Sequence, residues 1–109
     1  MGDRGQVYIK DENVWLYTHW EAYNLIDTVR TALTKKWRWD DPEYLARIIF
    51  CEMVKGKEMD ETGFGISGTP HSDAWRTITI DCQQQIISIN DGRGDLSFTF
   101  ENFINQTKE

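Results

Sequence analysis

Residues 7–33 read VYIKDENVWLYTHWEAYNLIDTVRTAL, and their hydrophobic pattern changes from a repeat of two to a helical repeat near Thr18. In 7–10 and in 14–18, apolar residues alternate with aromatic or polar ones, and the turn formers Asp11-Glu12-Asn13 lie between the two runs. Such alternation predicts a β-hairpin. The change of repeat predicts that a helix follows the hairpin directly.

The first predicted helix covers residues 19–36. Thr18 and Glu21 have the spacing of a capping box, in which the threonine hydroxyl accepts a hydrogen bond from the backbone amide three residues later. One apolar stripe follows at helical spacing, formed by Ala22, Ile26, Val29 and Leu33. We expect this stripe to pack on a sheet.

A second helix is predicted to begin after Asp41 or one residue earlier. Asp41 precedes a proline, an arrangement typical of a capping carboxylate before the first helical position. In the alternative, Asp40 is the cap and Trp39 packs onto Tyr44 as a hydrophobic staple. We expect this helix to be largely buried and to end at Gly56. Its apolar positions are Tyr44, Leu45, Ala46, Ile48, Ile49, Phe50 and Met53.

The last part of the chain predicts further strands and a single domain. Strand patterns occur at 63–67, 76–82, 86–89 and 96–98. Thr99 is placed to cap a short last helix. The sequence therefore predicts one α+β domain over residues 1–109, with an antiparallel sheet of about five strands and two helices packed on one face. The row that is expected to face these helices is Ile78, Ile80 and Cys82.

The composition narrows the possible partners and compartments. The 109 residues carry 12 lysines and arginines against 18 aspartates and glutamates, which gives a net charge of −6. Since nucleic-acid-binding domains usually carry a basic face, we expect no nucleic acid partner. The sequence shows neither a run near the ~20 apolar residues of a membrane span nor a signal-peptide core. We expect a cytoplasmic protein, without membrane association, whose two cysteines are reduced.

The segment Lys35-Lys36-Trp37-Arg38-Trp39 interleaves aromatic and cationic side chains. Tryptophan and arginine are enriched at the hot spots of protein interfaces. In the alternative, Trp37 or Trp39 covers the core between the two helices, and the lysines complement the end of the first helix. The predicted binding surface consists of Trp37, Arg38 and Trp39, with His19 and Trp20 nearby.

Two hypotheses of function follow. The first is a non-enzymatic binding protein that contacts another protein or a second copy of itself, because no catalytic set of residues can be named from the pattern. The second is a small-ligand-binding protein or small enzyme with a site near His19 and His71. The other polar candidates for such a site are Asp73 and Asp81. Convergence of these four side chains on one pocket distinguishes the second hypothesis from the first.

Three further patterns are candidates for chemical sites, namely a dinucleotide motif, a metal site and a nucleophilic cysteine. None of them meets its requirements, so we expect no cofactor and no metal. Gly63-x-Gly65-x-x-Gly68 matches the dinucleotide fingerprint, but a strand pattern follows it where that fingerprint requires a helix. The two histidines, His19 and His71, lack the close spacing of metal ligands. Cys82 shares the parity of Ile78 and Ile80, so it is expected to face the core and not to act as a nucleophile.

Four stretches of the chain carry a resemblance that covers most of its length. They are Met1-Gly-Asp-Arg4, Leu16-Tyr-Thr-His-Trp20, Trp39-Asp-Asp-Pro-x-Tyr-Leu-Ala-Arg-Ile-Ile-Phe50 and Gly63-x-Gly-Ile-Ser67. Together they resemble a group of small uncharacterised prokaryotic and phage-type proteins. The resemblance implies an origin in a phage or mobile element, and it implies no activity, cofactor or catalytic residue.

Overall fold

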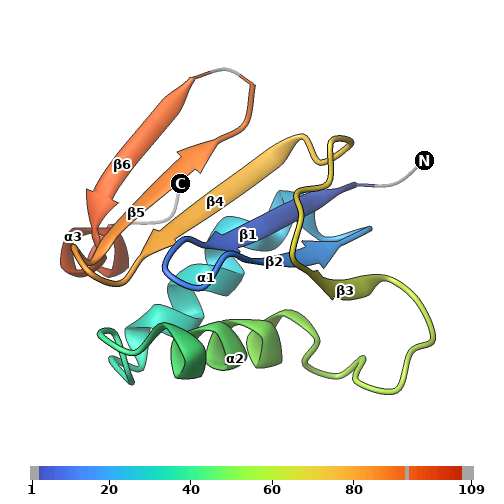
Figure 1. The fold of residues 1–109 in the computed structure, drawn as a ribbon, viewed down its shortest axis with the longest axis horizontal. Coiled ribbons are helices and arrows are strands. Elements are labelled where there is room, and N and C mark those ends of the chain that lie inside the picture. Colours follow the sequence, from blue (N-terminus) through green and yellow to red (C-terminus); the bar gives the residue numbers. More distant parts are fainter. Residues whose placement is uncertain (1–2, 93, 107–109) are drawn as a thin grey trace.

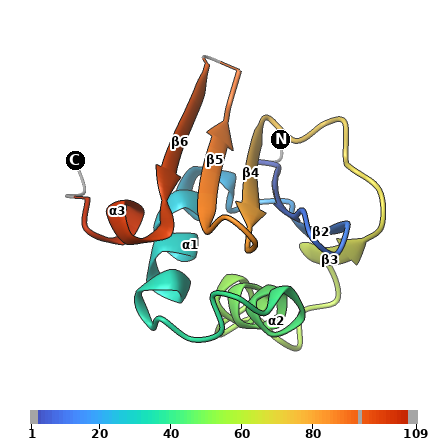
Figure 2. The same ribbon diagram turned by 60° about the vertical axis from the view of Figure 1, so that its left-hand side comes forward.

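The computed structural model describes residues 3–92 and 94–106 and forms one six-stranded sheet with helices on one side of it. The elements are β1 (Gly5–Ile9), β2 (Val14–Thr18), a 3₁₀ helix (Ala22–Asn24), α1 (Leu25–Thr34), α2 (Pro42–Met53), β3 (Phe64–Ser67), β4 (Arg76–Asp81), β5 (Ile86–Asn90), β6 (Asp95–Thr99) and α3 (Phe100–Ile104). The strand order is β3-β2-β1-β4-β5-β6 (Figure 1). The predicted α+β class is confirmed, but the sheet has six strands where about five were predicted, and α3 accompanies the two predicted helices (Figure 2).

The sheet is mixed, so the prediction of an antiparallel sheet was wrong at one place. β1 and β2 form the expected antiparallel hairpin, but β1 pairs with β4 in parallel. The cause is the connection after β3, which runs from Gly68 to Trp75 and crosses β1 on its way to the other side of the hairpin (Figure 1). Because β3 and β4 run in the same direction, β4 has to lie parallel to β1.

The hydrophobic core lies between the sheet and the helices. The predicted row Ile78, Ile80 and Cys82 is buried there, as are Val7 and Ile9 of the neighbouring strand. Helices contribute further buried side chains, namely Leu25, Val29, Leu33, Leu45, Ile48, Ile49, Phe100 and Phe103. Side chains of opposite parity, such as those of the aromatic residues in β1 and β2, lie on the outer face of the sheet.

The first helix begins later than the hydrophobic pattern predicts. Thr18 Oγ1 does accept from the Glu21 amide at 3.1 Å, yet the α-helix starts only at Leu25, after the 3₁₀ helix. Asp3 explains the delay, since its carbonyl oxygen accepts from the Ala22 amide at 3.1 Å and its carboxylate accepts from the Tyr23 amide at 2.8 Å. These bonds to a distant residue replace a regular first turn.

The second helix has the cap that its proline predicts. Asp41 is the N-cap, and its carboxylate accepts from the Tyr44 amide, so the alternative frame with Asp40 as cap is wrong. The helix ends at Met53, and Gly56 adopts a φ of +82° in the turn beyond it. The helix is less buried than predicted, because Tyr44 is 48% exposed and Cys51 is exposed as well.

Candidate functional site

Three of the four predicted polar residues come together beside the end of β2. The rings of Tyr17 and His71 have centroids 4.1 Å apart, and His19 lies two residues beyond Tyr17 with its ring 6.5 Å away. Arg4 Nε lies 3.3 Å from His19 Nδ1 and 3.2 Å from an oxygen of Asp73. Residues from the N-terminal segment, β2 and the β3–β4 connection therefore form one cluster.

The β3–β4 connection is held on the outer face of the sheet by one buried amide. Gln6 is only 4% exposed. Its Oε1 accepts from the backbone amide of His71 at 2.9 Å, and its Nε2 donates to the His71 carbonyl at 3.3 Å and to Thr77 Oγ1 at 3.0 Å. Both backbone groups of His71 are thus paired with a strand side chain, which fixes the imidazole against Tyr17.

The hydrogen bond from Arg4 determines the tautomer of His19. A guanidinium nitrogen can only donate, so His19 Nδ1 is the acceptor at 3.3 Å and the ring proton is on Nε2. The Tyr17 hydroxyl lies 3.3 Å from the same Nδ1 atom. No described residue hydrogen-bonds to Nε2 in this structure, so the imidazole has one N–H that is open to a ligand.

A cavity of about 320 Å³ lies next to this imidazole. It is lined by Tyr17, His19, Trp20, Thr62, Gly63 and Phe64. Three aromatic side chains, one histidine and one threonine hydroxyl therefore surround the space. Its volume is at the lower end of the range typical of small-molecule sites, which are mostly apolar with a few fixed polar groups.

Gly63 is the residue that allows Trp20 to form a wall of this cavity. A Cβ atom at this position would lie 2.5 Å from Trp20 Cζ3. The backbone φ of Gly63 is +105°, a value that residues other than glycine rarely adopt. The Gly63 carbonyl also accepts from the His19 amide at 2.8 Å. The close contact of Trp20 with the backbone thus depends on glycine.

An ion pair ties the segment after α2 to the residue that follows Trp20. Lys57 Nζ lies 2.8 Å from a carboxylate oxygen of Glu21. This hydrogen bond, together with one from Asn24, lowers the pKa of Glu21 below its usual value. The hydrogen bond to Glu21 in turn raises the pKa of Lys57. The pair lies at the surface and is screened by solvent, so it orients the chain next to the cavity more than it stabilises the fold.

Asp81, the fourth predicted polar candidate, does not join the cluster. It is at the end of β4, where its carboxylate lies 3.5 Å from Lys10 Nζ and accepts from the Gln84 amide at 3.1 Å. Among residues 3–92 and 94–106, no group of three histidine, cysteine, aspartate or glutamate side chains could hold a metal ion.

The Trp37–Trp39 segment divides into a core residue and exposed residues. Trp39 packs against the core, with its Nε1 donating to the Leu33 carbonyl at 3.1 Å and its ring edge-on to Phe100 at 5.3 Å. Trp37 is 57% exposed, and the Arg38 guanidinium lies 4.4 Å from the ring centroid of Tyr44. The alternative in which one tryptophan covers the core thus applies to Trp39.

The exposed residues Trp37 and Arg38 do not form one surface with His19 and Trp20. His19 and Trp20 precede α1, whereas Trp37 and Arg38 follow it, and a helix of ten residues is about 15 Å long. The predicted binding surface therefore consists of two separate places on the molecule.

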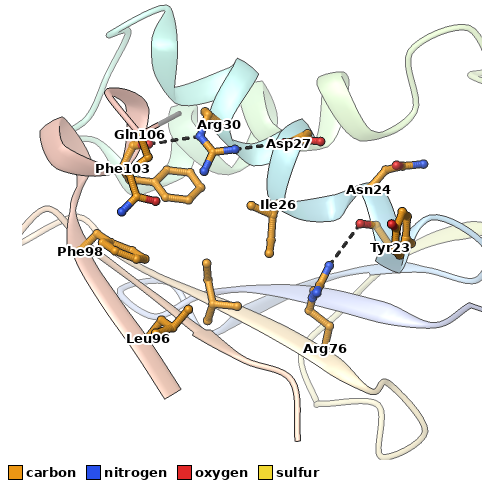
Figure 3. Close-up of a pocket in the computed structure, with 11 residues that line it drawn as sticks. Tyr23, Asn24, Ile26, Asp27, Arg30, Arg76, Leu96, Phe98, Phe103 and Gln106 are labelled. Carbon is orange, nitrogen blue, oxygen red and sulfur yellow. Dashed lines mark hydrogen bonds and ion pairs between the residues drawn. The ribbon is translucent and has the colours of Figure 1, made fainter. Parts of the chain in front are cut away.

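A further cleft contains none of the candidate site residues that the sequence analysis named. It has a volume of about 390 Å³ and lies between α1, the strands β5 and β6, and α3 (Figure 3). Arg30 and Arg76 both line it. A signal for Arg76 was present, because it shares the parity of Ile78 and Ile80 and therefore has to point toward the helices.

The two cysteines differ sharply in environment. Cys82 is buried, and burial, with a smaller contribution from the nearby Asp11 carboxylate, raises the pKa of its thiol to about 12. The predicted core position of Cys82 is confirmed. A thiol with this pKa carries almost no thiolate near neutral pH, so Cys82 is not a nucleophile there.

This contrast predicts selective alkylation. At pH 8 the folded protein is expected to react with iodoacetamide at Cys51, which is exposed, and to leave Cys82 unmodified. In denaturant both thiols are expected to react. Mass spectrometry of peptides from the native protein checks this, and equal modification of both cysteines would contradict the buried position of Cys82.

No helix among residues 3–92 and 94–106 is long and apolar enough to cross a membrane.

Comparison with known proteins adds no family to this description. The resemblance to small prokaryotic and phage-type proteins stays a prediction. The chain matches no family model, no curated protein and no solved structure.

Proposed function

We propose that this protein is a binding protein that takes a small planar aromatic molecule with a carbonyl group into the cavity beside His19. The observation that carries the proposal is that His19, whose Nδ1 accepts from Arg4, lines one cavity together with three aromatic side chains. His71 and Asp73 lie outside the lining of this cavity, where they contact Tyr17 and Arg4. Residues far apart in the sequence are held there by specific hydrogen bonds, which is how binding sites are kept in a fixed geometry.

The chemistry of the lining supports this class of ligand. Tyr17, Trp20 and Phe64 supply aromatic surface, against which a flat ring packs in a stacked or edge-on arrangement. His19 Nε2 supplies a donor for a carbonyl oxygen. Because Asp73 compensates the charge of Arg4 behind the imidazole, a neutral ligand is favoured over an anion.

Titration with benzamide tests this proposal. We expect benzamide to bind in the millimolar range and to shift the ¹H–¹⁵N signals of the Trp20 indole and the Gly63 amide. His19→Phe keeps an aromatic ring but removes the Nε2–H donor, so it is expected to weaken binding about fivefold. The matched control is His71→Phe, which keeps a ring next to Tyr17 and is expected to change the affinity less than twofold.

Two results would count against the cavity as the site. One is equal binding of cyclohexanecarboxamide, which has the same carbonyl group but no planar ring. The other is a titration in which benzamide shifts signals elsewhere and leaves those of Trp20 and Gly63 unchanged.

A second candidate function is contact with a protein partner through Trp37 and Arg38. The specific observation is backbone strain, since Lys36 and Arg38 have φ values of 58° and 57° although neither is glycine. Non-glycine residues in this region cost free energy and cluster at functional sites. The strained turn leaves Trp37 exposed, with Lys35 Nζ 5.8 Å from its ring centroid.

Loss of a partner on a single substitution tests this second candidate. Trp37→Ala is expected to abolish co-purification of a stoichiometric protein partner while leaving the melting temperature unchanged, because the side chain is mostly in solvent. Tyr23→Ala is the control, since Tyr23 is another exposed aromatic residue and lies in the 3₁₀ helix at the other end of α1. A partner retained by Trp37→Ala would exclude this surface.

A further inference from the structure

The cleft between α1 and the β5–β6 side of the sheet has an apolar lining and an open entrance. Its apolar residues come from two helices and two strands, and they are Ile26, Ile89, Leu96, Phe98 and Phe103. Leu96 is 58% exposed, although its strand position directs it to the same face as the buried Ile89. In Figure 3, Leu96 and Phe98 lie on the opposite side of the cleft from Arg30. A ligand in this space would cover apolar surface that now contacts water.

Arg30 brings a fixed positive charge to one end of the cleft. Its Nε donates to the Phe103 carbonyl at 3.2 Å, one terminal nitrogen lies 3.0 Å from an Asp27 oxygen, and the guanidinium lies 4.5 Å from the centroid of the Phe103 ring. The remaining terminal nitrogen points toward the cleft in Figure 3. This group is therefore oriented before a ligand arrives, which reduces the entropic cost of binding.

Arg76 lies at the other end and is more deeply buried. One of its terminal nitrogens donates to the carbonyls of Ala22 and Tyr23 at 2.9 and 3.2 Å, and the other lies 3.4 Å from an Asp91 oxygen. Its Nε is buried and has no hydrogen-bond partner among the described residues. Burial of a guanidinium with one unpaired N–H is costly, and a hydrogen-bond acceptor within reach of that N–H would offset the cost.

The cleft offers N–H donors that its own carboxylates do not take. Arg30 is paired with Asp27 and Arg76 with Asp91, so the charges of the two guanidiniums are balanced. One terminal nitrogen of Arg30 and the Nε of Arg76 stay without a carboxylate partner among the described residues, and a ligand carboxylate can accept from such donors. The volume of about 390 Å³ lies within the range of small-molecule sites.

We propose that this cleft is a second binding site, and that it takes a small aliphatic carboxylate. The carboxylate would accept a hydrogen bond from the free terminal nitrogen of Arg30, and the aliphatic chain would lie on Ile89, Leu96 and Phe98. This site shares no lining residue with the cavity beside His19, so the two sites can be tested independently.

Titration with hexanoate followed by ¹H–¹⁵N spectra tests the second site. We expect saturable shifts of the Leu96 and Phe98 amides, and at least tenfold weaker binding of hexanamide, which has the same chain without the charge. Arg30→Gln is expected to weaken hexanoate binding about tenfold. Arg47→Gln removes an exposed arginine from α2, away from the cleft, and is expected to leave the affinity unchanged.

If Arg30→Gln does not fold, a variant of Leu96, which belongs to the apolar lining of the cleft, still tests the proposal. Leu96→Ser changes a mostly exposed side chain, so the protein is expected to fold and to bind hexanoate at least threefold more weakly. Equal affinity for hexanoate and hexanamide would overturn the proposal. The proposal would also be overturned if the ¹H–¹⁵N signals of the cleft residues shifted with protein concentration and not with hexanoate. Such shifts would indicate that the cleft is a contact between two copies of the chain.

Discussion

Replacing Trp39 by alanine is expected to lower the free energy of unfolding by about 3 kcal/mol, at the lower end of what loss of a core tryptophan costs. The indole packs on the core and lies edge-on to Phe100 at 5.3 Å, so its loss leaves a cavity where the α1–α2 connection covers α3. The variant also loses the hydrogen bond from Nε1 to the Leu33 carbonyl. That carbonyl belongs to the last turn of α1.

The matched control is Trp37→Ala, two residues away in the same connection. Trp37 is 57% exposed, and Lys35 Nζ lies 5.8 Å from its ring centroid, so the expected change is within 0.5 kcal/mol. Urea denaturation of both variants gives the two changes in the free energy of unfolding, provided that this free energy falls with urea concentration at the same slope in each. Similar losses in both variants, or a larger loss in Trp37→Ala, would contradict the division of this segment into a core residue and an exposed residue.

Replacing Gly5 by alanine is expected to cost about 2 kcal/mol, because the added methyl group has no room. A Cβ atom on Gly5 would lie 2.7 Å from Ala22 Cβ and 3.2 Å from both Ala22 Cα and Leu25 Cδ2. The backbone of the 3₁₀ helix would have to move away from β1. That movement would also disturb Asp3 and Arg4, which hold the segment after β2 in place.

Two further variants show whether this close contact is the cause. Gly65→Ala places the same methyl group in β3, where no atom lies within 4 Å, and is expected to change stability by less than 0.5 kcal/mol. Adding Ala22→Gly to Gly5→Ala removes the closest atom and is expected to recover part of the loss. Thermal unfolding of the set measures these differences. A cost in Gly65→Ala as large as in Gly5→Ala would point to strand propensity and not to packing.

The features that were predictable from the sequence are those set by neighbouring residues. The hairpin of β1 and β2 follows from alternation with turn formers between the strands, and the start of α2 follows from Asp41 before a proline. The cap of α3 was predictable for the same reason, since Thr99 Oγ1 accepts from the Asn102 amide at 3.1 Å. Each of these signals acts over at most a few residues.

Features that depend on distant residues were not predictable in this way. The parallel pairing of β1 and β4 results from the path of the β3–β4 connection, and the late start of α1 results from hydrogen bonds to Asp3. Periodicity carries no information about either, because both are set by contacts far apart in the chain.

The candidate site combines both kinds of information. His19, His71 and Asp73 could be selected by residue type, but only the crossing connection brings His71 to Tyr17 and Asp73 to Arg4. Asp81 has the same chemistry and remains at the far end of β4 with Lys10. Residue type thus identifies candidates, and topology decides which of them meet.

The central claim is that an aromatic carbonyl compound binds between Tyr17, Trp20 and Phe64, and intermolecular nuclear Overhauser effects test it most directly. With the protein saturated by benzamide, we expect contacts from the benzamide ring protons to the side chains of Trp20 and Phe64, which line the cavity. Contacts only to Leu96 and Phe98 in the Arg30 cleft, or no contacts under saturating conditions, would contradict the claim.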